Sequence, residues 1–308
     1  MDNTLLEQGT NVIYNNISHD ETQYLDLIRT ILNKGSMETT RNGQVLSIFG
    51  YFMRFSLFNG QIPIITTKNT AWKPCFKELM WFIRGDTNNQ TLTDQNVHIW
   101  DANGTRAFLD SRNLKHLEEN DLGPIYGHQW RHFNAPYETC HTNYEGKGID
   151  QLANIITALK DPSQRSSRRL VMSAWNPCQL DEMALPPCHI LVQFNVREGK
   201  YLSCSLYQRS GDVGLGVPFN IVSYSFLTHI LAKHCGLEPE EFIYTLGNAH
   251  IYQAHIDALK EQCNREPYPF PKIKLKSNKE NIEDYSIDDM EWIDPYVHHP
   301  TIKMKMIA

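Results

Sequence analysis

The sequence predicts a single domain of the α+β class. Its 308 residues are 41% hydrophobic, which is enough apolar material for one large core. Segments with strand periodicity gather around a hairpin in the second half of the chain, and segments with helical periodicity lie on both sides of them. No internal repeat, low-complexity block or break in composition marks a linker. We expect one folded unit over 20–308, after a loose polar tail over 1–19.

In the first half of the chain, apolar spacing predicts two helices and one extended region. Residues 21–32 carry apolar side chains at a helical spacing, and residues 76–83 are almost continuously apolar, typical of a buried helix. Gly85 is the expected C-terminal cap of the second helix. Residues 45–57 alternate and are rich in aromatic side chains, which favours one or two strands. The polar stretch 107–148 predicts loops and short turns that cover the core.

The middle of the chain predicts one helix followed by strands. Residues 151–159 are amphipathic, and the Asp161-Pro162 pair ends that helix. Residues 170–175 form a short apolar run. Residues 190–196 and 200–207 are expected to be two strands of a hairpin, because a glycine-containing turn separates them.

The last third predicts two helices and a peripheral sheet. Residues 220–234 are typical of a long buried helix, and residues 251–262 of a second one. Residues 270–294 alternate lysines with apolar residues and contain acidic turns, a pattern typical of edge strands.

Composition excludes several classes of function. The net charge of −6 gives no reason to expect binding to nucleic acid, which needs clustered basic surface. The polar residues 1–10 do not resemble a signal peptide, and no stretch approaches the ~20 apolar residues of a membrane span. Seven cysteines at irregular spacings form neither a disulfide framework nor a zinc signature. We expect a reducing compartment: the cytoplasm, with the nucleus also possible.

The most informative stretch places a thiol, a cation and an amide within 33 residues. It contains Leu185-Pro-Pro-Cys188-His189, then Gln208-Arg-Ser-Gly-Asp212, then Pro218-Phe-Asn220. A thiol is a nucleophile, an arginine binds phosphate, and an amide pairs with the edge of a heterocycle. A cysteine among apolar residues is more often an inert core residue. Here two prolines make the backbone before the cysteine rigid, and Arg209 would lower the thiol pKa if the fold brings it near.

This stretch resembles the nucleophile region of the thymidylate synthase family, and the resemblance runs from about residue 20 to the last residue. Further motifs follow the family's order: Leu46-Ser-Ile-Phe-Gly50, Thr66-Thr-Lys68, Glu78-Leu-Met-Trp-Phe82, Ile99-Trp-Asp-Ala-Asn103, Asp121-Leu-Gly-Pro-Ile-Tyr-Gly127, Ser173-Ala-Trp-Asn-Pro177, Leu246-Gly-Asn-Ala-His-Ile-Tyr252, Arg265-Glu-Pro267 and Pro300-Thr-Ile-Lys303. The pattern is closest to the eukaryotic-type, monofunctional branch. The resemblance implies layers of mixed β-sheet and helices, and a homodimer that packs sheet against sheet.

The resemblance also implies the reaction. In the family, the cysteine that matches Cys188 adds to C6 of dUMP, and C5 then attacks the one-carbon unit of 5,10-methylenetetrahydrofolate. Loss of the C5 proton and hydride transfer from the folate give dTMP and dihydrofolate. The family is therefore a methyltransferase family in which folate is both co-substrate and reductant. We expect no NAD(P) and no metal, and no glycine-rich dinucleotide loop is present.

Matching the family's motifs residue by residue gives three sets of expected site residues. The catalytic set is Cys188, Glu78, Tyr126, Asn220 and Asp212. The set that binds dUMP is Arg41, Arg168, Arg169, Arg209, Ser210, Asn220, His250 and Tyr252. The folate set is Ile99, Trp100, Leu185, Asp212, Gly216, Phe219 and Ala308, with the segment 302–308 folding over the ligands. Lys68 and Lys73 are expected to attract a polyglutamate tail.

Arg168 and Arg169 match the pair that the family donates across the dimer interface. The residues Gln164-Arg-Ser166 look like an insertion before this pair, so Arg165 is an alternative donor. The loop that carries Arg41 is one residue shorter than usual. Asn248 stands where the family commonly has aspartate, which removes a charge near the sugar site.

For several of these residues an ordinary structural role remains open. Arginines are most often solvated. Glu78 would face solvent if it lay on the polar edge of its helix, beside Lys77. Asn220 would serve as the N-cap of its helix. His189 follows the nucleophile on a strand and so points to the opposite face, which favours a supporting role.

Three other functions fit these residues less well. A cysteine hydrolase needs a histidine spatially opposite the thiol, which adjacency of Cys188 and His189 does not supply. A non-catalytic nucleotide-binding protein would be expected to lack Cys188 or Glu78. A hydroxymethylase acting on dCMP is expected to carry aspartate at position 220.

Overall fold

The computed structural model describes residues 19–307, and its centre is a six-stranded sheet. The strand order is β1-β2-β6-β5-β4-β3; β5 and β6 are parallel, and the other neighbouring pairs are antiparallel. The strands are β1 (Ser36–Thr40), β2 (Gly43–Ser56), β3 (Val171–Ser173), β4 (His189–Arg197), β5 (Tyr201–Asp212) and β6 (Glu238–Tyr252). A separate hairpin pairs β7 (Ile273–Leu275) with β8 (Met290–Trp292). The predicted α+β class is confirmed.

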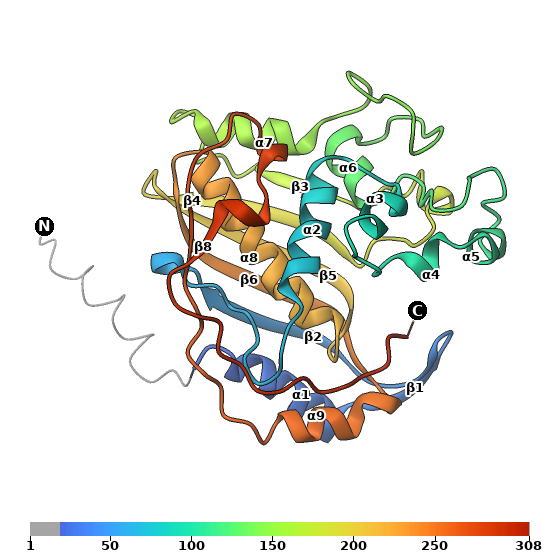
Figure 1. The fold of residues 1–308 in the computed structure, drawn as a ribbon, viewed down its shortest axis with the longest axis vertical. Helices are drawn as coiled ribbons and strands as arrows, with labels where there is room; N and C mark the ends of the chain where they lie inside the picture. Colours follow the sequence, from blue (N-terminus) through green and yellow to red (C-terminus); the bar gives the residue numbers. More distant parts are fainter. Residues whose placement is uncertain (1–18, 308) are drawn as a thin grey trace, which may run out of the picture.

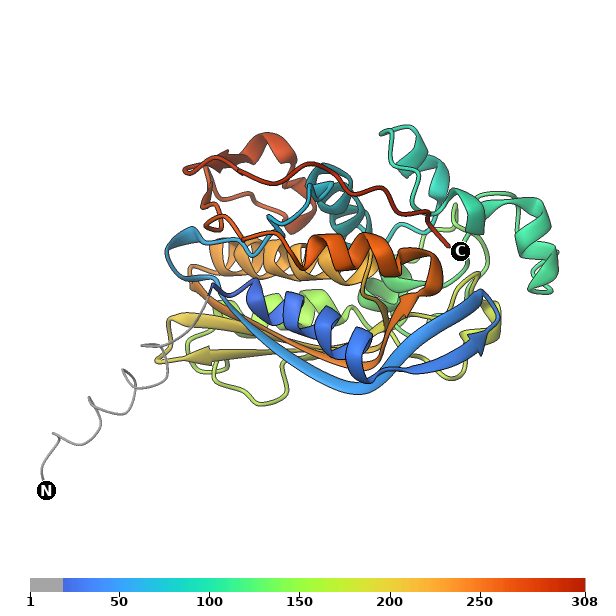
Figure 2. The same cartoon turned by 90° about the horizontal axis from the view of Figure 1, so that it is seen from below.

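Helices cover one face of the sheet (Figure 1). They are α1 (Thr22–Lys34), α2 (Trp72–Ile83), α3 (Asn89–Thr93), α4 (Asp101–Gly104), α5 (Arg106–Ser111), α6 (Tyr126–His132), α7 (Gln151–Lys160), α8 (Gly216–His234) and α9 (Ile256–Gln262). In Figure 2 the blue helix α1 and the orange helix α8 lie along the same side of the strands. None of the helices in the part of the chain described here is long and apolar enough to span a bilayer.

Helix α8 is the centre of the core and connects the parallel pair β5 and β6. It is buried on nearly all sides, so its polar side chains need internal partners. Ser225 and Thr228 donate to the backbone carbonyls of Ile221 and Tyr224, both at 2.7 Å. A helix that satisfies its own hydroxyl groups can be enclosed without an energetic penalty for desolvating them.

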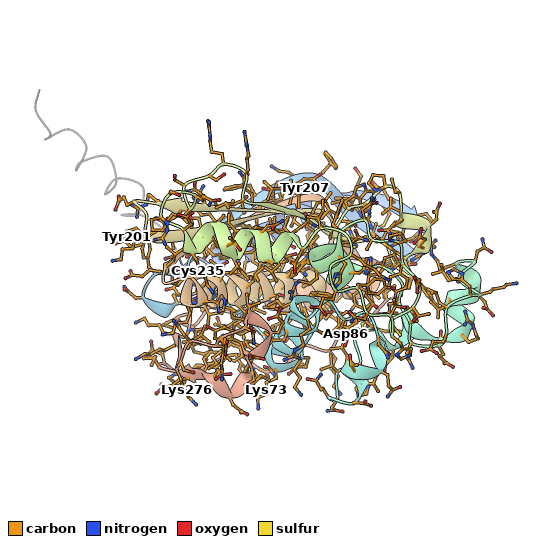
Figure 3. All side chains as sticks on the ribbon, turned by 90° about the horizontal axis from the view of Figure 1, so that it is seen from above. Lys73, Asp86, Tyr201, Tyr207, Cys235 and Lys276 are labelled. Atoms are coloured by element: carbon orange, nitrogen blue, oxygen red, sulfur yellow. The ribbon has the colours of Figure 1, made fainter. Side chains whose placement is uncertain are left out.

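Within residues 19–307, no helix packs on the opposite face of the sheet, which is partly apolar. Leu191, Tyr207, Thr245 and Phe52 are lateral neighbours on β4, β5, β6 and β2, and therefore form one row across the sheet. Three of them are solvent-exposed: Leu191 by 41%, Tyr207 by 37% and Phe52 by 54%. Figure 3 shows Tyr207 on this face and the labelled lysines on the opposite side of the molecule, beyond α8.

A buried carboxylate anchors the start of the fold. Glu21, just before α1, is fully buried, and its two oxygens accept from the backbone N–H and the hydroxyl of both Thr66 and Thr67. Four donors satisfy the charge, which holds the segment that leads to Lys68 in place.

Local signals correctly predicted the ends of α2 and α7 and the β4–β5 turn. Gly85 follows α2 with a left-handed φ of +75° and donates to the Phe82 carbonyl, which confirms it as the terminator. The β4–β5 turn has Glu198 and Gly199 at φ values of +54° and +65°, as a tight hairpin turn requires. Helix α7 ends at Lys160, immediately before Asp161.

Two predictions in the second half were wrong. The helix expected over 251–262 is only α9, because residues up to Tyr252 belong to β6, a 15-residue strand that was missed. The alternation of Phe242, Tyr244 and Leu246 is its strand signal, and the acidic start at Glu238 obscured it. The strands expected over 270–294 are short and form their own hairpin, joined by 3-10 turns, outside the main sheet.

Strand β1 and several short helices also escaped the sequence analysis. Strand β1 forms a hairpin with β2, and the stretch 107–148 contains α6, whose residues 126–130 are all buried. Short helices with few apolar positions give too little periodicity to be recognised, and tertiary packing decides them.

Candidate active site

The fold brings Cys188 and Arg209 together at the start of the β4–β5 pair. The Arg209 backbone N–H donates to the Cys188 carbonyl at 2.8 Å. The Arg209 guanidinium donates from Nε to the Pro187 carbonyl at 2.7 Å and from Nη2 to the Pro186 carbonyl at 3.0 Å. This leaves Nη2 3.9 Å from the Cys188 sulfur. The two prolines thus fix the arginine beside the thiol, and the Trp175 ring lies 5.5 Å from its guanidinium carbon.

Burial and charge act in opposite directions on this thiol. Burial raises the pKa of Cys188, and the positive charge of Arg209 lowers it. The predicted influence of Arg209 is therefore present, but burial outweighs it and the net pKa lies above its ordinary value.

Glu78 faces the interior of the protein and not solvent. It lies on α2, is 6% exposed, and its Oε1 accepts from the indole Nε1 of Trp100 at 2.8 Å. Burial raises the Glu78 pKa to about 7, and the Trp100 hydrogen bond lowers it in part. The polar edge of α2 is instead formed by Lys77, which donates to the Gln95 carbonyl. Glu78 can therefore gain or lose a proton near neutral pH.

We expect Glu78→Gln to stabilise the protein above pH 7 by an amount on the order of 3 kcal/mol. Between the ordinary carboxyl pKa near 4.5 and about 7, native Glu78 keeps a proton that the unfolded chain has lost. The Glu78 contribution to the free energy of unfolding therefore falls as pH rises through this window. Glutamine keeps the acceptor for Trp100 and cannot ionise.

Urea unfolding of both proteins at pH 4 and pH 8 measures the effect, with exposed Glu280→Gln as the control. A stability difference that does not grow between the two pH values would contradict the raised pKa.

Tyr126 links the thiol to a buried histidine. As the first residue of α6, it accepts the Cys188 backbone N–H on its hydroxyl oxygen at 2.7 Å. Its ring stacks on His189 with centroids 4.0 Å apart, and His189 Nδ1 is 2.6 Å from the Tyr224 hydroxyl on α8. Burial lowers the His189 pKa to about 3, so this imidazole is neutral. His189 points toward the helical layer and positions Tyr126 by stacking.

A cavity of about 300 Å³ lies where β1, β2, β5 and β6 meet. Its lining includes four residues of the predicted dUMP set. They are Arg41, Ser210, His250 and Tyr252. On adjacent strands, Ser210 is paired with Asn248 and Asp212 with His250.

Charges at the thiol and in the cavity act on the same side chain, Tyr252. Burial raises the Tyr252 pKa, Asp212 and Cys188 raise it further, and Arg41 lowers it. His250 Nδ1 donates to Asn248 Oδ1 at 3.0 Å, so the asparagine at the position where aspartate is usual still orients the imidazole. Sequence reasoning gave Asn248 no such part. The sequence did contain an indication of this contact: Asn248 and His250 are two residues apart, and on a strand that spacing places both side chains on one face.

Asn220 is not the N-cap of its helix. Helix α8 begins at Gly216, one turn earlier than predicted, so Asn220 lies inside it with its side chain half-buried. Its amide makes no side-chain hydrogen bond within the described residues and remains available to a ligand. An added Cβ on Gly216 would lie 3.8 Å from Asp212 Cβ and 3.9 Å from Asn220 Oδ1, so these three residues are close neighbours.

The residues predicted to bind folate differ in burial. Ile99, Leu185 and Phe219 pack against the core and stay half-buried, whereas Trp100 is buried with Glu78 as its partner. Ala308 lies outside the described residues, as do residues 1–18 of the predicted tail.

The C-terminal segment reaches this site and ends between α4 and the β1–β2 hairpin (Figure 1). His255 donates from Nε2 to the Lys305 carbonyl at 2.8 Å, and its Nδ1 lies 3.8 Å from Asp212. Met304 lies beside Gly214, whose added Cβ would come within 3.2 Å of the methionine sulfur. Sequence reasoning missed His255, since a buried histidine on a short helix carries no local signal.

One predicted ligand contact is wrong. Lys68 is 5% exposed and donates its amine to the Gly214 carbonyl, so it cannot attract a polyglutamate tail. Burial lowers its pKa to about 8. Lys73 is exposed on α2, and its role stays a prediction.

Arg168 and Arg169 lie apart from the cavity. Both are exposed in the loop between α7 and β3, and Arg169 lines a second hollow of about 590 Å³ together with α7 residues. Arg165 donates to the carbonyls of Gly199 and Lys160 of its own chain. Within one chain these arginines therefore do not join the other predicted phosphate ligands.

Comparisons with known proteins give the family and relatives of this chain. The sequence model of the family described as Thymidylate synthase matches residues 22–308. The chain is 55% identical over 301 residues to the bifunctional dihydrofolate reductase-thymidylate synthase of Plasmodium berghei (strain Anka), covering 96% of this chain and 50% of that protein. For the protein of the same name from Leishmania amazonensis the identity is 53% over 291 residues, covering 94% and 55%.

A third relative has nearly the same length. The thymidylate synthase of Saccharomyces cerevisiae (strain ATCC 204508 / S288c) is 50% identical over 297 residues, which cover 93% of this chain and 97% of that protein. The chain thus spans about half the length of the bifunctional relatives it matches, and nearly all of the yeast one.

Proposed function

The chain belongs to the thymidylate synthase family, and on that premise we propose that it methylates dUMP to dTMP with 5,10-methylenetetrahydrofolate. The observation that carries the proposal is the Cys188 thiol, held by Arg209 next to the cavity lined by Arg41, Ser210, His250 and Tyr252. That arrangement offers a nucleophile, cations for a phosphate and hydrogen-bonding groups for a sugar in one place.

The proposed chemistry begins with addition of the Cys188 sulfur to C6 of the uracil ring. The electron pair moves to the O4 side, and C5 becomes nucleophilic enough to attack the one-carbon unit of the folate. Loss of the C5 proton expels tetrahydrofolate and leaves a methylene group on C5. Hydride transfer from that tetrahydrofolate to the methylene group, with elimination of the Cys188 thiolate, gives dTMP and dihydrofolate. Tyr126 contacts the Cys188 backbone and is proposed to assist removal of the proton. Glu78, with its pKa near 7, is proposed to move protons near O4.

Recognition of dUMP is assigned to four groups of this chain. Arg209 uses Nε and Nη2 on the proline carbonyls, and its remaining nitrogen Nη1 makes no hydrogen bond within the described residues and is free for a phosphate oxygen. Arg41 and Ser210 add a charge and a hydroxyl to the same anion. Asn220 is proposed to pair with N3–H and O4 of uracil.

The contacts to the sugar and to the folate are proposed for the remaining predicted site residues. His250 and Tyr252 are proposed to bind the 3′-hydroxyl of the sugar. The folate is proposed to lie against Ile99, Trp100, Leu185 and Phe219 beside Gly216, with Asp212 accepting from the pterin. Ala308 would close over it. The proposed compartment is the cytoplasm, with the nucleus also possible, on the grounds of the irregular cysteine spacing.

A homodimer would complete the site. The row of Leu191, Tyr207 and Phe52 gives the uncovered sheet face an apolar surface that suits a second copy. Arg168 and Arg169 emerge at the β3 edge of this sheet, exposed and remote from the cavity of their own chain. We propose that they supply the phosphate site of the partner.

Mixing inactive Cys188→Ser chains with inactive Arg169→Ala chains is therefore expected to restore part of the activity. In a mixed dimer, one site combines the intact cysteine with an intact arginine from the partner. Each variant alone is the control, and subunit exchange is verified by mass. No recovery after verified exchange would mean that Arg169 does not act across the interface.

The overall function is tested by incubating the full chain with dUMP and 5,10-methylenetetrahydrofolate. Dihydrofolate absorbance should rise in step with dTMP. The same incubation with dCMP is the control for base choice. Absence of dihydrofolate formation by folded protein would reject the proposal.

A further inference from the structure

Outside the active site, three side chains with metal-binding chemistry converge on the surface. Glu118 follows α5, and Cys140 and His141 lie in the loop between α6 and α7. Their carboxylate, thiol and imidazole ligand atoms all lie within 4.8 Å of one another. Cys140 Sγ is 3.8 Å from Glu118 Oε1, and His141 Nε2 contacts the same oxygen. None of the three lines the cavity of the candidate active site.

We propose that Glu118, Cys140 and His141 form a binding site for a thiophilic divalent cation, of which Zn²⁺ is the best match. Zn²⁺ accepts thiolate, imidazole and carboxylate ligands together, whereas Mg²⁺ and Ca²⁺ prefer oxygen alone. Three protein ligands leave the fourth tetrahedral position to water.

The distances are close to what coordination needs. Zn–S bonds of about 2.3 Å and Zn–N or Zn–O bonds of about 2.0–2.1 Å at tetrahedral angles put neighbouring ligand atoms roughly 3.3–3.6 Å apart. The Cys140–Glu118 separation of 3.8 Å already approaches this value. His141 now touches the carboxylate through a hydrogen bond, and insertion of a cation between them needs only rotation of two exposed side chains.

The loop that carries the cysteine is held in place by buried groups. Asp121 is fully buried, and its Oδ2 accepts the Cys140 backbone N–H at 2.9 Å. Its Oδ1 accepts from the Tyr137 hydroxyl at 2.6 Å. The Tyr144 hydroxyl donates to the Thr139 carbonyl at 2.9 Å. A metal ligand whose backbone is fixed in advance loses less entropy on binding.

The charge around the thiol also favours a cation. Cys140 is half-buried, and the carboxylates of Asp121, Glu118 and Asp86 surround its thiol with negative charge. A thiolate and a carboxylate with a neutral imidazole carry two negative charges, which a divalent ion balances. The ion thus takes the place of the thiol proton.

The sequence hid this site because its ligands are not in a zinc-motif spacing. Glu118 precedes Cys140 by 22 residues, and the polar stretch between them was expected to be loops. The expectation of no metal rested on spacing alone.

The test is a titration of the full-length protein with Co²⁺, a spectroscopic substitute for Zn²⁺. We expect a thiolate-to-cobalt charge-transfer band and the intense visible bands of tetrahedral Co²⁺, saturating at one equivalent and abolished by excess Zn²⁺. Cys140→Ser should remove the charge-transfer band, and Glu118→Gln and His141→Ala should each weaken binding at least tenfold. Cys178→Ser, which changes an exposed cysteine elsewhere, is the matched control and should titrate like the parent.

A second readout needs no variant. Alkylation followed by mass spectrometry should show that Zn²⁺ protects Cys140 and leaves Cys178 reactive. Bands that persist in Cys140→Ser, bands that vanish in Cys188→Ser instead, or equal alkylation of Cys140 with and without Zn²⁺ would each overturn the site.

Discussion

Replacing Cys188 by serine is expected to lower turnover by several orders of magnitude while dUMP binding stays detectable. A hydroxyl group is a far weaker nucleophile than a thiolate near neutral pH, and covalent addition to C6 would no longer occur. Arg209 keeps its contacts to the carbonyls of Pro186 and Pro187 in the variant, so the phosphate site should survive. Steady-state rates and equilibrium binding of dUMP measure the two effects separately.

The matched control is Cys178→Ser, because this cysteine is exposed and lies outside the candidate site. Its activity should equal that of the parent. A sharper measurement uses 5-fluoro-dUMP with the folate, since fluorine is not removed as the C5 proton is. A stable adduct should map to Cys188 by mass spectrometry. Full activity of Cys188→Ser, or an adduct on another residue, would refute the proposed mechanism.

Asn220→Asp is expected to lose most activity on dUMP and to gain activity on dCMP. Uracil presents N3–H and O4, whereas cytosine presents an unprotonated N3 and an exocyclic amine. The amide of Asn220 can orient to match uracil, and aspartate replaces its donor with an oxygen acceptor. Each unsatisfied buried group costs about 1–3 kcal/mol, and sites built on such pairing discriminate by about 10⁴.

Values of kcat/KM for both nucleotides measure the change of preference. Asn278→Asp, an identical substitution at an exposed loop position, is the control for the added negative charge. Because Asn220 lies inside α8 and does not cap it, helix stability should be little affected. An unchanged preference for dUMP would show that Asn220 does not read the base.

Local chemistry explains which parts of the fold were predictable. The helix α1, the ends of α2 and α7, and the β4–β5 turn all depend on residues close in sequence, such as Gly85 and Gly199. Strand β6 depends on partners far away, because β2 and β5 flank it. Its acidic beginning has low strand propensity, and only the sheet around it makes it extended.

The sequence predicted which residues belong to the candidate site better than it predicted their burial and pKa. The motif resemblance named Cys188, Arg209 and the residues around the cavity, and the structure brings Arg41, Ser210, His250 and Tyr252 together. Spacing alone did not predict that burial raises the Cys188 pKa, nor that Lys68 is enclosed. Both depend on how many atoms surround a group, which is a property of the packed molecule.

The sequence by itself determined the α+β class, the family resemblance and the chemical types of the site residues, because each depends on residue identity, order and short-range periodicity. The tertiary structure alone decided which charges are buried, as for Glu78, and which side chains separated in sequence meet, as for Glu118 and Cys140. Among residues 19–307 it also left one sheet face without a covering helix and Arg169 away from the cavity of its own chain. Desolvation and Coulomb interaction depend on distance in space, and sequence separation does not encode that distance.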